Sequence, residues 1–272
     1  MIMCTDIDRI AELAKEDPKR QFYSIAHLMT VEKLYEAFGS LRKNASAGID
    51  GITYAEYEIN AEENVRQLHR RLVTGKYQVQ PLRRVYIPKE NGKQRPISIP
   101  SLEDKIVQKV VVDLMNAIYE QDFLDCSYGF RPGRSQHQAL DEVRRVICTR
   151  PTGWILELDI QSYFDKIVRG TLIEMVERRV SDGSMLRLTQ KWIKVGVIED
   201  GKLLISETGR GRPRVAVHRR CWLTCTFTMY SICGSKCGVG NEPMAMLSWC
   251  GSRTTSWLDS RSDQMPSGSG RN

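Results

Sequence analysis

Apolar side chains recur at helical spacing through much of residues 1–75. In the stretch "NAEENVRQLHRRLVTG", Asn60 is placed to cap a helix, and Glu63 is placed to close a capping box with it. One face of this helix then carries Val65, Leu68 and Leu72. The stretch "TVEKLYEAFGSL" is amphipathic in the same way, and the polar, Gly-rich "NASAGIDGITY" between them predicts a loop. Residues 1–75 therefore predict a helical N-terminal extension.

After residue 75 the pattern changes to short β-prone runs that alternate with helices. "RRVYIPKENGKQRPISIP" holds two such runs around Asn91-Gly92, a dipeptide typical of a hairpin turn. Ser101 and Asp104 then predict the start of a helix. The apolar stripe that should face a core consists of Ile106, Val110, Leu114 and Ala117.

The loop "SYGFRPGRSQHQAL" follows and ends at a capping box of Ser135 and Gln138. The helix after it has three apolar residues on one side, Leu140, Val143 and Ile147. The pattern continues with the strand "WILELD", helices near 171–179 and 184–195, and a second hairpin around Asp200-Gly201. Strands and helices mixed without a regular βαβ rhythm indicate an α+β domain.

The balance of charge adds a candidate partner to this picture. The chain has 272 residues and a formal net charge of +7, which favours a polyanionic partner such as nucleic acid. An inert basic surface fits the charge alone equally well. No apolar run reaches the roughly 18 residues of a membrane span, and the N-terminus lacks the apolar core of a signal peptide. We therefore expect a cytoplasmic protein with no membrane segment.

One acidic residue, Asp159, stands at the end of the strand "WILELD". Because apolar and polar residues alternate along this run, the strand would deliver the Asp159 carboxylate to an edge or a cleft. Mg²⁺ prefers oxygen ligands of this kind. The alternative makes Asp159 a turn cap and Phe164, five residues on, an ordinary core aromatic.

Basic residues form two further candidate sites. The first hairpin carries Lys89, Lys93 and Arg95, which could hold phosphates through charge and through the bidentate fork of arginine. The block "YGFRPGRS" adds Arg131 and Arg134 between glycines that allow close backbone approach. Read singly, each set is equally consistent with routine surface charge.

Taken in order, five blocks of the chain resemble the reverse transcriptases of bacterial mobile group II introns, the intron-encoded maturase family. They extend from about residue 45 to residue 211 and read "SAGIDGITY", "YIPKENGKQRPISIPSLEDKIVQKVV", "FLDCSYGFRPGRSQHQAL", "LELDIQSYFDKI" and "ETGRG". The resemblance implies a right-hand polymerase with fingers and a palm, which copies RNA into DNA with two Mg²⁺ ions. Members of this family often also assist the splicing of their own intron RNA.

The resemblance also implies a role for each matching residue. Asp159 resembles the first catalytic aspartate of the palm, and Ile160 is assigned with it to the metal site. Phe164 looks like the aromatic gate that excludes a ribonucleotide 2′-hydroxyl. Lys89 and Arg95 resemble finger residues that grip the incoming triphosphate. Support of the template strand or of the palm is expected from Arg131 and Arg134.

The resemblance stops after Gly211. The family would continue with Thr-Pro-Gln-Gly-Gly, then Ser-Pro-Leu-Leu-Ala-Asn, and later a Tyr-x-Asp-Asp hairpin, but residues 212–272 contain no Asp-Asp. The codons of these residues can also be read in the frame that starts at the third base of each codon. In that frame the bases fixed by residues 212–216 are compatible with the first block, and those fixed by residues 219–224 with the second. The bases fixed by residues 252–255 are compatible with Phe-Ala-Asp-Asp. We infer that one nucleotide was lost near the Gly211 codon, which makes 212–272 an out-of-frame, largely disordered tail.

The tail admits one other interpretation, because Cys221 with Cys225 and Cys233 with Cys237 form two Cys-x₃-Cys pairs that could belong to a zinc module. The sequence thus predicts three regions. They are the helical N-terminal extension of residues 1–75, reverse transcriptase fingers and partial palm at 76–211, and the tail at 212–272.

The expected function is that of an RNA-directed DNA polymerase (reverse transcriptase) of a mobile group II intron, in this chain an N-terminal fragment. Its partners would be the intron RNA, an RNA template with a DNA primer, and deoxynucleoside triphosphates. Because the Tyr-x-Asp-Asp motif is missing, the two-metal Mg²⁺ site would be incomplete and the chain inactive as a polymerase. The alternatives are an RNA-binding maturase-like fragment and another bacterial reverse transcriptase, such as a retron type.

Overall fold

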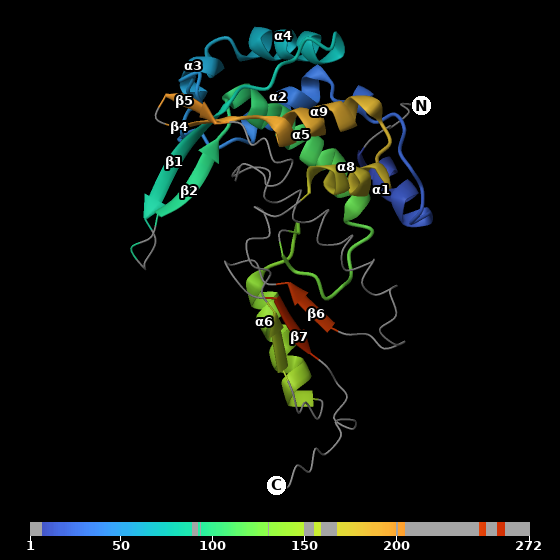
Figure 1. Cartoon of the computed structure of the whole chain (residues 1–272). Coiled ribbons are helices and arrows are strands. Elements are labelled where there is room, and N and C mark those ends of the chain that lie inside the picture. The colour runs from blue at the N-terminus through green and yellow to red at the C-terminus, as the bar shows by residue number, and fades with distance from the viewer. Residues whose placement is uncertain are drawn as a thin grey trace. The chain divides into compact units, whose positions relative to one another are not determined.

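The structure, a computed structural model, describes residues 7–88, 92, 94–129, 131–149, 155–158, 168–199, 201–204, 245–248 and 255–258. The helices and strands form two compact units (Figure 1). The larger unit holds most of the helices and a four-stranded sheet, and the smaller holds α6 and a three-stranded sheet.

The larger unit draws its elements from both halves of the chain. Its helices are α1 (Ile7–Glu16), η1 (Ala26–Leu28), α2 (Val31–Gly39), α3 (Tyr54–Glu58), α4 (Ala61–Val73), α5 (Leu102–Tyr119), α8 (Arg169–Glu177) and α9 (Gly183–Lys194). Its strands are β1 (Leu82–Pro88), β2 (Gln94–Ile99), β4 (Val197–Glu199) and β5 (Lys202–Leu204).

Helix α5 forms the centre of this unit. Fourteen of its 18 residues are buried, so the helix is enclosed on all sides rather than along one stripe. Helices α1 and α2 pack directly on it, and α4 packs on the outer side of α2 (Figure 1). The predicted start of α5 is confirmed, because the amide of Asp104 donates to the Ser101 hydroxyl at 3.2 Å. The predicted core stripe is also buried.

The sheet of the larger unit has the strand order β2-β1-β4-β5. Strands β1 and β2 are antiparallel, as are β4 and β5, and β1 pairs with β4 in parallel. Both predicted hairpins are therefore confirmed. Gly92 and Gly201 have φ of 73° and 76°, the left-handed region that glycine reaches without a steric cost.

Two buried side chains of the turn between α8 and α9 form hydrogen bonds with the backbone of the N-terminal segment. Arg179 is 3% exposed and donates to the backbone carbonyls of Ala14, Asp17 and Arg20, while its Nε lies 3.0 Å from a carboxylate oxygen of Asp122. The Asp182 carboxylate accepts from four backbone amides, those of Ile25, Ala26, Ser184 and Met185. Residues before and after the β1–β2 hairpin are thus bonded directly to one another.

The smaller unit consists of α6 (Gln136–Thr149) and the strands β3 (Ile155–Leu158), β6 (Ala245–Ser248) and β7 (Thr255–Leu258). Its sheet has the order β3-β7-β6, with both pairs antiparallel. The predicted capping box of α6 is confirmed: the amide of Gln138 donates to the Ser135 hydroxyl at 3.3 Å, and the Gln138 side chain accepts from the Ser135 amide at 2.8 Å.

The predicted capping box of α4 is wrong. Asn60 stands at the start of α4, but its side chain makes no capping bond. The side chain that donates to the Tyr57 carbonyl, at 3.2 Å, belongs to Asn64. Glu63 accepts from Gln67, four residues on. In α6, Leu140 is 53% and Ile147 42% exposed. The buried residues of that helix are Ala139 and Val146, with Val143 and Tyr128 packed against Val146.

Candidate nucleotide and nucleic-acid interface

The β1–β2 hairpin is the first part of the candidate interface. Its register places Arg95 opposite Ile87, and β1 ends at Pro88, directly before Lys89. Lys89 itself lies outside the described residues. At the root of the hairpin Arg83 and Arg84 are partly buried in β1, and towards its tip Tyr86 and Ile87 are 44% and 47% exposed. The hairpin therefore presents apolar and aromatic surface beside basic positions, a combination typical of nucleic-acid binding.

The Gly-rich loop between α2 and α3 is fastened to the start of α5. A Cβ atom on Gly48 would lie 2.5 Å from the Cα of Ser101, so only glycine fits against that backbone. The Lys105 ammonium, on a residue 7% exposed, donates to the Ser46 carbonyl at 2.7 Å. Burial lowers the pKa of Lys105; the Asp50 carboxylate opposes this shift, whereas the charge of Arg83 adds to it.

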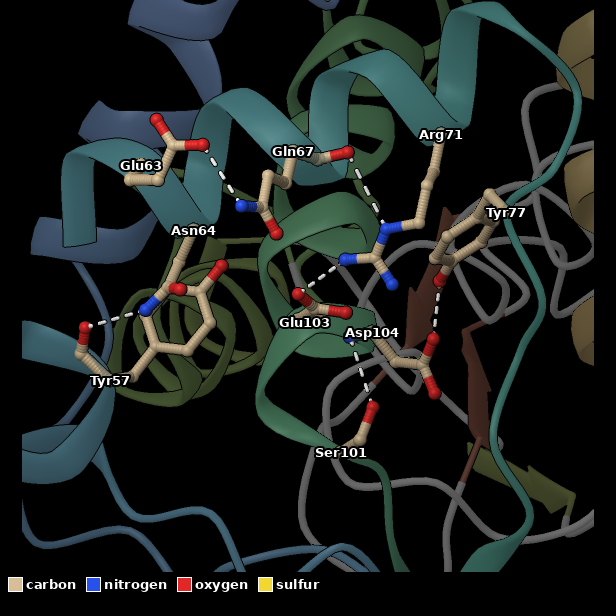
Figure 2. A network of polar contacts seen from close by, with 9 residues as sticks. All are labelled: Tyr57, Glu63, Asn64, Gln67, Arg71, Tyr77, Ser101, Glu103 and Asp104. Atoms are coloured by element: carbon tan, nitrogen blue, oxygen red, sulfur yellow. Dashed lines mark hydrogen bonds and ion pairs between the residues drawn. The ribbon is translucent and has the colours of Figure 1, made fainter. Parts of the chain in front are cut away.

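A polar network lies at the start of α5, around Glu103 and Asp104 (Figure 2). Tyr77 and Asp104 point toward each other, and the Tyr77 hydroxyl donates to the Asp104 carboxylate. The second carboxylate oxygen of Asp104 accepts from the Gln80 amide at 3.1 Å. Arg71 reaches from α4 to Glu103 with Nη2 and Oε1 2.6 Å apart. The network joins α4, α5 and the chain segment that leads into β1.

Burial dominates the ionisation of this network. It raises the pKa of Asp104 to about 6, against the hydrogen bonds from Tyr77, Ser101 and the Gln80 amide, which favour the charged form. Burial also raises the pKa of Tyr77 well above its usual value, and the Asp104 carboxylate adds to that shift. The charged form of the Asp104 carboxyl is therefore disfavoured by burial despite the hydrogen bonds that it accepts.

The two arginines of the loop that precedes α6 differ in burial and in their hydrogen-bond partners. Arg131 is 9% exposed, and its Nη1 donates to the carbonyls of Leu124 and Ser127, each at 2.9 Å. Its guanidinium also lies over the Phe123 ring, 4.7 Å from the centroid. The Arg134 side chain is 31% exposed and stands 3.7 Å from the exposed Asp125. Arg131 thus braces the loop from inside, whereas Arg134 keeps accessible donors.

Comparison with known proteins turns this geometry into an assignment. Residues 87–217, from the end of β1 onward, match the family described as reverse transcriptase (RNA-dependent DNA polymerase). Protein YkfC of Escherichia coli K12 is 38% identical over 208 residues, which cover 74% of this chain and 55% of YkfC. The group II intron-encoded protein LtrA of Lactococcus lactis is 34% identical over 196 residues, 71% of this chain and 32% of LtrA. The chain thus carries a reverse transcriptase domain over residues 87–217 and is similar to a group II intron-encoded protein.

Its relatives include further intron-associated proteins, among them nuclear intron maturase 2 of Arabidopsis thaliana, 31% identical over 104 residues. The 104 aligned residues cover 37% of this chain and 14% of that maturase. The chain spans about half the length of YkfC and about a third of LtrA. A solved partial Cas6-RT-Cas1–Cas2 complex superposes with a TM-score of 0.52 at 17% identity, over 85% of this chain and 37% of that one. The mixed α+β fold of the reverse transcriptase is thereby confirmed.

Of the region predicted to bind metal, the structure describes the strands only. β3 ends at Leu158, directly before Asp159, so the predicted strand is confirmed. Asp159, Ile160 and Phe164 lie outside the described residues, as do the five cysteines of the tail. Among the residues that the structure describes, no three His, Cys, Asp or Glu side chains form a group that could hold a metal ion. No described helix is long and apolar enough to cross a membrane.

Three residues that shape the larger unit were missed from sequence. Tyr77 and Lys191 carry no local pattern, and Asp182 has only the signature of a helix cap. Their partners lie far along the chain: Asp182 bonds to Ile25, 157 residues away, and Lys191 to the Tyr77 carbonyl, 114 residues away. A single sequence contains no signal that would have paired them.

Proposed function

We propose that residues 76–211 form the fingers and partial palm of an RNA-directed DNA polymerase of the group II intron type, and that this polypeptide does not itself polymerise DNA. The observation that carries the proposal is the extent of the family match. It begins at residue 87, near the end of β1, includes β2 and β3, and ends at residue 217. This end lies six residues after Gly211, near whose codon we infer the lost nucleotide.

Within this proposal each site residue keeps the role that the family resemblance implies. Asp159 and Ile160 would hold Mg²⁺, Phe164 would gate the sugar, and Lys89 with Arg95 would grip the triphosphate. The chemistry that two metal ions supply is activation of the primer 3′-hydroxyl and stabilisation of the leaving phosphate. Asp159 alone provides too few carboxylates for two ions, so no polymerisation step is assigned to this chain.

The register of the small sheet supports the frame argument. β7 begins at Thr255, which pairs with Leu158, the residue before Asp159. In the alternative frame the two aspartates would occupy positions 254 and 255. A carboxylate pair would then be encoded beside the strand that leads to Asp159, whereas the chain as translated carries Thr254 and Thr255 there.

The test starts from the coding DNA. Reading it from each third base should reveal an open frame from the Gly211 codon through the codons for 252–255, and a stop codon in that frame would end the frameshift hypothesis. The chain as it stands should show no Mg²⁺-dependent extension of a DNA primer on an RNA template. A gene with one nucleotide restored near codon 211 and its downstream frame intact should show extension that Asp159→Asn abolishes.

RNA binding without polymerisation is the second function that the chain supports. The net charge of +7 and the accessible Arg134 are the observations in its favour. The partners would be the intron RNA or a template–primer duplex. Binding to a structured RNA should weaken steeply as salt rises, because each phosphate contact releases counterions. Affinity that does not change between 50 and 200 mM salt, a range over which about six contacts cost roughly a thousandfold, would contradict this function.

A further inference from the structure

The segment that joins α4 to β1, residues 74–81, determines where the hairpin begins, and it is held at several points. Tyr77, at 2% exposure, uses all three of its polar groups. Its amide donates to the Arg71 carbonyl at 2.9 Å, its hydroxyl donates to Asp104, and its carbonyl accepts from the Lys191 ammonium at 2.6 Å. Three different helices therefore contact one residue of the connector.

The last residues before the hairpin are held in the same way. The Gln80 amide donates to Asp104, and the Leu82 amide donates to the Gly196 carbonyl at 3.0 Å. Leu82 and Val197 then pack together as a small buried cluster, where β1 and β4 begin their parallel pairing. Because β4 follows α9 directly, the base of the hairpin is joined to both α5 and α9.

Burial of a carboxylate at this position costs free energy of desolvation. Asp104 is 1% exposed, and a buried charge is tolerated only when hydrogen bonds replace its hydration. Apolar side chains would fill the same space at a lower cost but would allow the connector to slide. A carboxylate that accepts two directional bonds, from the Tyr77 hydroxyl and from the Gln80 amide, specifies a single placement instead.

We propose that Asp104 is a positioning residue that, with Tyr77 and Lys191, holds the base of the β1–β2 hairpin against α5 and α9. We call Tyr77, Asp104 and Lys191 together the polar strut. On the basis of the proposed function, the strut positions the hairpin so that Lys89 and Arg95 can bind the polyphosphate of a nucleotide. The other charged groups beside it are Glu103, paired with Arg71, and Lys105, bound to the Ser46 carbonyl.

The chain offers a matched pair of variants for the test. Tyr77→Phe removes one hydroxyl from the strut and keeps the ring. Tyr57→Phe removes a hydroxyl of similar burial, 4% exposed, which bonds to none of Tyr77, Asp104 and Lys191 although it lies near Glu103. Amide hydrogen exchange then compares the strands β1 and β2 with α8, which reports the stability of the rest of the unit.

In Tyr77→Phe, protection of the β1 and β2 amides should fall about three- to tenfold, the effect of one net hydrogen bond. Protection of α8 should fall less, and Tyr57→Phe should change neither. The carbon-13 signal of the Asp104 carboxyl should titrate at a higher pH in Tyr77→Phe, because the lost bond favours the charged form. Equal exchange in the two variants, or an unmoved titration, would overturn the strut.

Binding of inorganic tripolyphosphate separates this inference from the proposed function. Wild type should bind it, Tyr77→Phe should bind several-fold more weakly, and the double variant Lys89→Ala with Arg95→Ala should not bind. If wild type fails to bind, the nucleotide role of the hairpin is wrong, while the exchange data still decide the strut. If Tyr77→Phe binds as tightly as wild type, positioning of the hairpin by the strut is refuted.

Discussion

Substitution of Asp182 tests how strongly the N-terminal segment is joined to the rest of the larger unit. One carboxylate oxygen accepts from the amides of Ile25 and Ala26 at 2.7 and 2.8 Å, and the other from those of Ser184 and Met185 at 2.8 and 3.3 Å. The second pair caps α9, and the first pair holds η1 and the residues before it. One side chain thus has two separable tasks.

The magnitude follows from these two tasks. A lost N-cap costs about 0.5–2 kcal/mol. Bonds to a charged acceptor contribute about 1.5–3 kcal/mol each, with the lower value fitting Ala26, whose amide is only partly buried. Asp182→Ala should therefore lower the free energy of unfolding by about 3.5–6.5 kcal/mol, a large part of the roughly 5–15 kcal/mol typical of a domain. Asp182→Ser keeps a capping oxygen and should lose about 3–4.5 kcal/mol.

Urea unfolding followed by circular dichroism measures both losses, and exchange at the Ile25 and Ala26 amides locates them. Asp17→Asn is the matched control, since the Asp17 carboxylate accepts one amide, that of Lys19, at the surface. It should change stability by less than about 0.5 kcal/mol. If Asp182→Ser is as stable as the control, the bonds to Ile25 and Ala26 contribute nothing net, and the reasoning is refuted.

Three further outcomes are expected. Because burial raises the folded-state pKa of Asp104 to about 6 from 3.8, its contribution to stability is present below pH 4 and lost as pH rises through 6. The loss is of the order of 3 kcal/mol, and the slope of stability against pH between 4 and 6 should flatten in Asp104→Asn; an unchanged slope would contradict it. Gly48→Ala should destabilise the unit by more than about 1 kcal/mol in urea melts, since its Cβ would overlap Ser101 backbone; wild-type stability would refute this. Arg131→Met should lower the free energy of unfolding by about 1–3 kcal/mol. Arg134→Met should leave stability unchanged and lower the salt dependence of RNA binding by about one phosphate contact. Loss of stability in Arg134→Met, with a changed salt dependence in Arg131→Met instead, would disprove these separate roles.

The elements that were predicted correctly depend on neighbours in the chain. The hairpin turns at Gly92 and Gly201 need only a residue that tolerates positive φ, and the caps at Ser101 and Ser135 join residues three apart. Local spacing determines such contacts before the chain folds. The predicted cap at Asn60 is absent because its backbone, with φ of −127° and ψ of 36°, lies outside the extended conformation that capping residues usually adopt.

The sequence by itself determined the α+β class, the hairpins and the order of the family blocks, because these are written in local patterns. It also determined where the reverse transcriptase pattern stops. Tertiary structure alone decided that Arg131 braces its own loop, that Asp104 holds the base of the hairpin, and that Asp182 binds residues 25 and 26. Those roles come from buried polar groups that need partners once water is excluded, and which partners they meet depends on how distant segments of the chain pack.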